Sequence, residues 1–224
     1  MTNPRSKPKA ENPLKKFAFT LVFTLALGVT AAWANVDTVD WGQLGPTGTV
    51  LSTPQSWIST GGATGLVGVF GPFNFERRDQ GNGWNGNFTP GDHLIWNQGN
   101  PGQIRIVFNS PVSDPGANIQ ADFFGPFTAT ITAYDAGFNF LGSNTLGGNS
   151  TSAGDGSAIF LGLTGVSGIT ILDFSLVDIN GGGDEAINSL VFNSGPTVPE
   201  PGSLLLLGSG LLGAIGYGRR RLGL

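Results

Sequence analysis

The densest group of oxygen-bearing side chains lies in the segment DINGGGDEAIN, residues 178–188. A run of three glycines inside it lets the backbone wrap closely, and calcium takes six to eight oxygen ligands. The EF-hand spacing fails here, because the fifth and twelfth positions counted from Asp178 are Gly182 and Ser189. The segment is therefore either a structural calcium site or a solvated hairpin loop. No cofactor is required, and calcium is the one that the sequence suggests, with four candidate ligands: Asp178, Asn180, Asp184 and Glu185.

Aromatic side chains form a second group with a chemical use, because their flat faces can stack on sugar rings. Core packing is the default expectation for the candidates, which are Trp41, Trp57, Trp84, Trp96 and Tyr134. Trp84 is the exception. It lies among glycines and asparagines in GNGWNGNFTPGD and has few apolar neighbours in sequence that could bury it. We therefore select Trp84 as the candidate ligand contact.

Catalytic chemistry has little support in the sequence. Cysteine is absent and His93 is the only histidine, so any serine triad would have to use that residue. No glycine-flanked serine stands between a strand and a helix, as a nucleophile elbow requires. Glutamate is scarce between residues 35 and 196, where only Glu76 and Glu185 occur, and this disfavours a glycosidase. We expect no enzymatic activity, and a secreted hydrolase is the least favoured function.

Charge is distributed unevenly along the chain. Residues 35–196 carry thirteen acids against three arginines, Arg77, Arg78 and Arg105, and no lysine, which gives a net charge of −10. Phosphate binding requires clustered cations, so nucleic acid is excluded as a partner.

The central region reads as a set of half-buried β-strands. Apolar residues alternate with polar ones in QIRIVFN, ANIQADFF, FTATITAY and ITILDFSLV, and AIFLGL and AINSLVFN add further strands. Loops rich in glycine, asparagine and serine separate these segments, and none shows a helical period. We predict an all-β domain over residues 35–196, an antiparallel β-sandwich or jelly roll of about eight to ten short strands.

The first 34 residues have the three parts of a secretory signal peptide. A basic leader precedes an apolar run over residues 17–29, and small residues follow at Ala32 and Ala34. Cleavage by signal peptidase between Ala34 and Asn35 would leave Asn35 as the new N-terminus. The alternative is an uncleaved anchor, but the apolar run is shorter than the roughly 20 residues of a spanning helix.

The C-terminal segment, residues 197–224, combines a rigid motif, an apolar run and a basic cluster. The motif is Pro199, Glu200 and Pro201, whose prolines favour a stiff extended backbone. Residues 202–218 are apolar and predict a short transmembrane helix. The basic cluster is Arg219, Arg220 and Arg221, and positive charge after an apolar run is typical of the cytoplasmic side of a membrane segment.

This ordered set resembles the sorting signals of the PEP-CTERM proteins of Gram-negative bacteria. The resemblance implies transient anchoring in the inner membrane, then cleavage near the motif by an exosortase, and release or transfer of the body to the cell envelope or extracellular matrix. The stretches FTATITAYDAGFNFLGSNT and DEAINSLVF are similar to the bodies common among PEP-CTERM proteins, which resemble carbohydrate-binding β-sandwiches. We therefore expect a non-catalytic envelope or biofilm-matrix protein. The alternative is an extracellular carbohydrate-binding module with exopolysaccharide as its partner. If residues 178–188 form a calcium site, calcium would stabilise this module.

Overall fold

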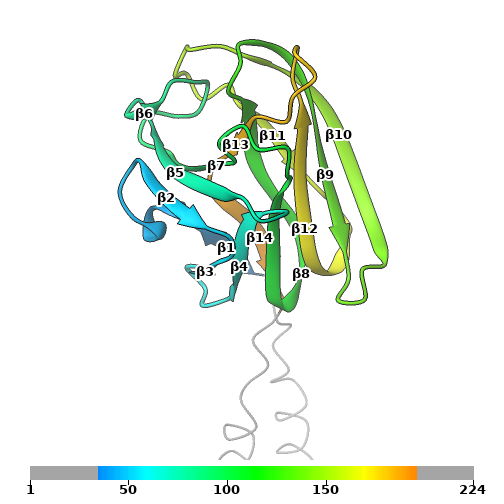
Figure 1. Ribbon diagram of the computed structural model, residues 1–224. Helices are drawn as coiled ribbons and strands as arrows, with labels where there is room; N and C mark the ends of the chain where they lie inside the picture. Colours follow the sequence, from blue (N-terminus) through cyan, green and yellow to red (C-terminus); the bar gives the residue numbers. More distant parts are fainter. Residues whose placement is uncertain (1–34, 196–224) are drawn as a thin grey trace, which may run out of the picture. The chain divides into compact units, whose positions relative to one another are not determined.

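The computed structural model describes residues 35–195, which form an all-β body (Figure 1). Several predictions lie outside these residues: the signal helix and Ala34, the motif Pro199–Glu200–Pro201, the apolar run after it, and the basic cluster Arg219–Arg221. Asn35, the predicted first residue of the mature chain, is the first residue of β1. Within the described residues, no helix has the length and apolar character needed to cross a membrane.

Fourteen strands and one 3-10 helix make up the body. The 3-10 helix η1 is Trp41–Leu44. The strands are β1 (Asn35–Val39), β2 (Thr49–Ser52), β3 (Gln55–Ile58), β4 (Thr64–Val69), β5 (Asn74–Gln80), β6 (Gly83–Trp84), β7 (His93–Trp96), β8 (Ile104–Ala121), β9 (Gly125–Tyr134), β10 (Phe140–Ser150), β11 (Ile159–Gly162), β12 (Ser167–Val177), β13 (Glu185–Ile187) and β14 (Leu190–Ser194). The all-β class is confirmed, with more strands than the eight to ten expected.

The strands form one hydrogen-bonded sheet that folds over its own core, in a sandwich-like arrangement (Figure 1). The main path runs β10-β9-β12-β8-β13-β7-β5-β2. Strand β8 connects most of it, because its 18 residues pair with β4, β11, β12, β13 and β14 along different parts of their length. Every strand pairing is antiparallel except the short β5–β6 ladder.

The predicted alternation fills the core. In β9 the inward residues Phe127, Ala129, Ile131 and Ala133 are all buried, and the intervening threonines lie on the other face. Leu172, Phe174 and Leu176 of β12 meet them from the neighbouring strand. Period-two patterning therefore identified the buried faces of β9 and β12. It was wrong at the end of ANIQADFF, where Phe123 is 50% exposed beyond the end of β8.

Two strand boundaries differ from the sequence prediction. Gln103–Asn109 and Ala117–Phe124 were expected as separate strands, but most of both segments belongs to the single strand β8, which passes through Pro111 and Pro115 and ends at Ala121. Pro111 lies where the ladder with β12 shifts register, between Val107 and Val112, and Pro115 lies where the ladder with β14 shifts, between Ser113 and Gly116. Both prolines therefore occupy irregular parts of the sheet, where proline is tolerated. The segment AINSLVFN shows the reverse difference: it was expected as one strand but forms two, β13 and β14, with Asn188 and Ser189 between them.

Candidate functional site

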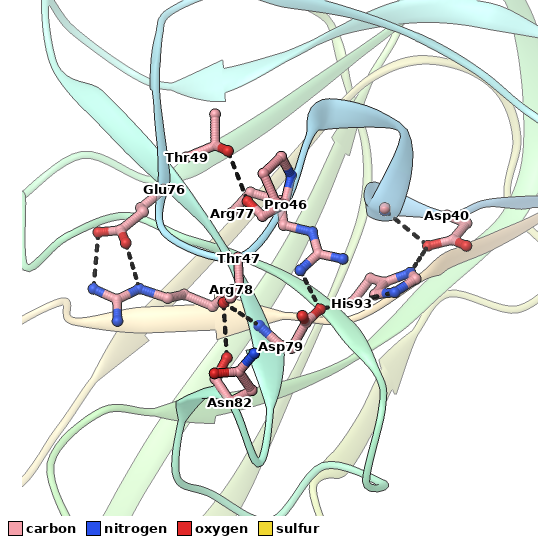
Figure 2. Close-up of polar contacts among 11 residues, drawn as sticks. Asp40, Pro46, Thr47, Thr49, Glu76, Arg77, Arg78, Asp79, Asn82 and His93 are labelled. Carbon is pink, nitrogen blue, oxygen red and sulfur yellow. Dashed lines mark hydrogen bonds and ion pairs between the residues drawn. The ribbon is translucent and has the colours of Figure 1, made fainter.

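A cluster of six ionisable side chains lies where η1, β5 and β7 meet: Asp40, Glu76, Arg77, Arg78, Asp79 and His93 (Figure 2). Asp40 caps η1 by accepting a hydrogen bond from the Gly42 amide at 2.9 Å. The same carboxylate oxygen lies 2.6 Å from Nδ1 of His93, the first residue of β7. Burial alone would raise the pKa of Asp40, but the hydrogen bonds from Gly42 and His93 outweigh it and hold the pKa below its usual value.

The other side of the imidazole faces a second carboxylate. Nε2 of His93 lies 3.8 Å from Oδ1 of Asp79 on β5, and that oxygen also pairs with the buried Arg77 guanidinium. The Asp79 amide donates to Thr47 Oγ1 at 3.1 Å, which fixes the backbone at this point. His93 therefore lies between two carboxylates on two different elements (Figure 2).

A second ion pair, between Arg78 and Glu76, extends the cluster along β5. Arg78 contacts Glu76 through Nε at 2.7 Å and donates from Nη2 at 2.9 Å (Figure 2). Its guanidinium also stacks over the Trp96 ring, with 4.8 Å between Cζ and the ring centroid. Because the carboxylate and the ring both restrain this arginine, the pair fixes β5 against β7.

This arrangement does not match a nucleophilic triad. A triad needs a hydroxyl or thiol at one ring nitrogen of histidine and an orienting carboxylate at the other. Here both nitrogens of His93 face carboxylates, and the nearby hydroxyl of Thr47 donates to the Asn82 carbonyl at 2.7 Å. The contacts in the cluster join η1, β5 and β7, and that is the role the geometry supports.

A second polar group lies on the outward face of the sheet, where Arg105 of β8 is paired with Asp173 of β12. The two residues are opposite each other in the ladder. Arg105 donates to both carboxylate oxygens, from Nε and from Nη2, each at 2.7 Å. The hydrogen bonds to Asp173 raise the pKa of Arg105 and burial lowers it. The hydrogen bonds outweigh burial, so the pKa is raised and the guanidinium is a permanent cation.

Aromatic rings flank this guanidinium. Its Cζ lies 4.4 Å from the centroid of Phe70 and 5.8 Å from that of Phe138, both within cation-π range. Phe70 is 57% exposed and Phe138 is 62% exposed, so both rings present apolar surface to solvent. Phe138 also has a φ of 61°, an uncommon backbone state for a bulky residue.

The turn that holds Phe138 is fixed by Asp135. One carboxylate oxygen of Asp135 accepts hydrogen bonds from the amides of Gly137 and Asn139, at 2.8 and 2.9 Å. The Asn139 side chain donates to the same carboxylate, and this bond is the largest of the influences that lower its pKa. The turn thus sustains the unusual backbone of Phe138 and keeps its ring beside Arg105.

An apolar depression of about 250 Å³ adjoins the same arginine. It is lined by Arg105 and Val107 of β8, residues 66–71 of β4 and the turn after it, and the Thr53–Pro54 pair. Arg105 therefore borders both an apolar hollow and two exposed aromatic rings. We call Arg105, Phe70, Phe138 and this depression the Arg105 surface.

The prediction that Trp84 is exposed is wrong. Trp84 is only 5% exposed and packs with Phe88, Leu94 and Trp96 in a second small core. The glycines and asparagines beside it in sequence do form its loop, but the ring is covered by residues from β7, β13 and the segment before β11. Trp84 therefore offers no free face for a sugar. Trp41 and Trp57 are buried as well.

The predicted calcium ligands Asp178 and Asp184 accept hydrogen bonds from groups of the protein itself. Asp178 accepts hydrogen bonds from the amides of Asn180 and Gly182, at 2.7 and 3.1 Å, which closes the glycine-rich loop. Asp184 accepts from the Trp96 indole, 2.5 Å away. Asp178 and Asp184 lie near enough for the negative charge of Asp178 to contribute to the raised pKa of Asp184, whose main cause is burial.

Glu185 is buried inside the sheet. One of its oxygens accepts from the Ile104 amide at 3.2 Å, and the other has no hydrogen-bond partner within the described part of the chain. Burial raises the pKa of Glu185 well above its ordinary value. Over residues 35–195, no group of three or more acidic or histidine side chains is placed to hold a metal ion, so this geometry gives the calcium prediction no support.

The Arg105 surface was not selected from the sequence. Arg105 was noted only as one of three arginines, and Phe70 and Phe138 lie in turns without a repeating pattern. The available signal was the alternation of β8, which places Arg105 on the face opposite Ile104 and Ile106. Its flanking rings come from residues 35 positions before and 33 positions after it in the sequence, so only the folded chain brings them together.

Comparison with known proteins identifies the tail. Residues 197–221 match the family described as the PEP-CTERM protein-sorting motif, so the resemblance of the tail is confirmed. The crystal structure of a DUF4465 family protein from Bacteroides caccae is similar to the body, with a TM-score of 0.47 and 12% identity. That similarity covers 71% of this chain and 100% of the other. No curated protein matches the chain.

Proposed function

We propose that this chain is a non-catalytic protein of the cell envelope or the surrounding matrix. The sorting motif at residues 197–221 implies an exported, envelope-targeted protein that an exosortase recognises. The match to the motif is the observation that carries the proposal. In this role Pro199, Glu200 and Pro201 form the recognition element, and the chain is the substrate of the processing enzyme.

The order of segments in the tail supports a transient stay in the membrane. Residues 203–218 would reach about 24 Å as a helix, less than the roughly 30 Å of a bilayer core. The arginines at 219–221 would remain on the cytoplasmic side. Glu200 would then lie on the opposite side of the membrane, where a membrane-embedded peptidase can reach it.

The non-catalytic part of the proposal draws on the His93 cluster. The only histidine of the chain lies between the carboxylates of Asp40 and Asp79, an arrangement that supports a structural role for it. The paired charges hold strands together at an edge of the body. A matrix component needs a stable folded surface with high negative charge more than it needs a reactive centre, and the body has a net charge of −10.

A second candidate function, carbohydrate binding, is favoured by the Arg105 surface. Sugar rings present apolar faces that stack on aromatic side chains, and hydroxyls that accept from a guanidinium. Phe70 and Phe138 offer exposed rings on either side of Arg105, and Arg105 has Nη1 without a hydrogen-bond partner among residues 35–195. In this version the matrix protein would hold exopolysaccharide at that surface.

Mass spectrometry of the exported protein tests the main proposal. The expected mature chain begins at Asn35 and lacks the residues after the Pro-Glu-Pro motif. Glu200→Gln should block processing and keep the protein with the membrane fraction, whereas Asp155→Asn, a change in an exposed loop of the body, should be processed normally. A chain recovered from the medium that still ends in Leu224 would overturn the proposal.

A further inference from the structure

Strand β10 is an unusually long open edge of the sheet. Six strands have a single hydrogen-bonded neighbour within the described residues: β1, β2, β3, β6, β10 and β11. Five of them have five residues or fewer, whereas β10 has eleven. Figure 1 shows β10 as the outermost strand beside β9. A free edge presents a row of unpaired backbone N–H and C=O groups, so β10 offers a long template for another strand.

Most of the usual protections of an edge strand are missing from β10, which keeps one irregularity at its N-terminal end. Charged residues, proline and bulges prevent edge-to-edge pairing in most proteins. β10 contains no charged residue and no proline, and its ladder with β9 is regular from Gly142 to Ser150. Only the first pairing, at Phe140, is shifted in register. The short edges β2 and β3 are protected by length alone, and β10 is not.

The negative charge of the body limits which molecules can pair with β10 and over which surface they can approach. Residues 35–195 carry thirteen acids and three arginines, so two copies repel each other over most of their surfaces. Between Gly125 and Ser150, however, the only charged residue is Asp135, which lies in the turn between β9 and β10. The neutral pair β9–β10 is therefore a surface where one copy can approach another without bringing carboxylates together.

The side chains of β10 leave apolar surface uncovered at this edge. Leu146 is opposite Ala129 in the ladder, on the face that is buried in β9, yet it is 41% exposed because the sheet ends there. A strand added beyond β10 would cover it. On the outer face, Thr145 pairs with Thr130 across the ladder with 2.9 Å between the hydroxyls, so that face stays neutral and polar.

We propose that a second copy of this chain pairs with β10 through its own β10, antiparallel about a two-fold axis. A two-fold axis perpendicular to the sheet brings the same strand from each copy together and makes the two strands run in opposite directions. In the register centred on Leu146, the two Leu146 side chains lie side by side on the inner face and cover each other. The two sheets become continuous across the dimer, and their charged surfaces stay apart.

The dimer is tested with the exported chain, purified in the form that mass spectrometry identifies. Sedimentation equilibrium between 1 and 100 µM should show a monomer–dimer equilibrium. Added salt should tighten the dimer, because screening weakens the repulsion between two bodies of like charge. Hydrogen exchange should show alternate amides of β10 gaining protection as the protein concentration rises.

Variants locate the interface. Leu146→Lys places two ammonium groups opposite each other in the proposed register and should raise the dimer dissociation constant at least tenfold. Thr145→Lys tests the same edge from the outer face, in case Leu146→Lys lowers stability. Val50→Lys is the matched control, because Val50 is also an exposed apolar residue on an edge strand, β2, and should leave the constant unchanged.

Three results would overturn the proposal: a monomer at every concentration, an open-ended polymer, or a dimer that survives both β10 lysines. Binding of a free peptide along β10 in place of a second copy would appear as β10 protection that does not depend on protein concentration. Circular dichroism and melting curves of each variant establish that the fold is retained.

Discussion

Nδ1 of His93 lies 2.6 Å from Oδ1 of Asp40, although 53 residues separate the two in the sequence. The contact joins β7 to the 3-10 helix that follows β1. The imidazole packs so closely on η1 that a Cβ built on Gly42 would lie 2.5 Å from Nδ1 of His93. Glycine at position 42 is therefore required for this approach, and not for an unusual backbone angle.

Gly42→Ala should displace the imidazole and destabilise the body by about 0.5–1 kcal/mol, because the His93 ring is 37% exposed and can move aside, losing its contact with Asp40. Urea denaturation measures this change, and the NMR signals of His93 report the displacement. Gly195→Ala is the control, because no atom of residues 35–195 would lie within 4 Å of its Cβ. If both variants lose the same stability, the approach of His93 to η1 is not what requires glycine.

Asp37 predicts the behaviour of the body in acid. Burial alone would raise the pKa of Asp37, but hydrogen bonds from Ser59, Gly61, Thr60 and Thr38 outweigh it and leave the pKa below the ordinary 3.8. The carboxylate thus contributes stability that is present above about pH 4 and is lost as the pH falls through the lowered pKa.

Asp37→Asn should lower the free energy of unfolding at pH 7 by about 1–3 kcal/mol, since it removes hydrogen bonds to a charged acceptor. The difference from the wild type should shrink as the pH falls below 4. Denaturant curves at pH 7, 5 and 3 measure it. A loss that is the same at all three pH values would contradict the charge-dependent role.

The Arg105 surface makes a prediction about ligand binding that follows from the second candidate function. Phe138→Ala and Arg105→Ala should each weaken binding to the exopolysaccharide of the producing cells about tenfold or more, as truncation of a central contact residue does. Affinity electrophoresis against the isolated polysaccharide measures this. Trp84→Phe is the control, because the buried Trp84 ring should make no contact. Equal binding by all three variants would contradict the proposal that carbohydrate binds at this surface.

Period-two alternation predicted the buried faces of β9 and β12 correctly because the pleat of a strand points successive side chains to opposite faces of the sheet. Ile131 and Leu172 follow the pattern and are fully buried. The same reasoning fails for Trp84, whose covering residues come from Leu94, Ala158 and Ala186, distant in sequence. A residue's local neighbours say little about burial where distant loops and strands supply the contacts.

The sequence pattern also did not predict that β8 is one continuous strand. Pro111 and Pro115 are ordinary signals for ending a strand. They are tolerated here because β8 changes partners along its length, with β12 and β4 at one end and β11 and β13 at the other. Which partner each half takes depends on topology, and no single segment encodes it.

Glu185 makes the final prediction, which also decides between a buried acid and a cation ligand. One of its oxygens is buried without a hydrogen-bond partner, and burial raises its pKa well above the ordinary 4.5. A raised pKa means that the folded state favours the protonated acid. Stability from this group is fully present below about pH 4.5 and is lost as the pH rises through the raised pKa.

Glu185→Gln keeps an oxygen that can accept from the Ile104 amide and removes the charge. It should therefore stabilise the body at pH 7 by about 1 kcal/mol or more, roughly 2–4 °C in Tm, and have little effect at pH 4. Melting curves at both pH values, with and without millimolar calcium, measure this. If Glu185 were instead a calcium ligand, calcium would raise the Tm of the wild type and the Gln variant would lose that gain, because a neutral amide binds the ion more weakly than a carboxylate.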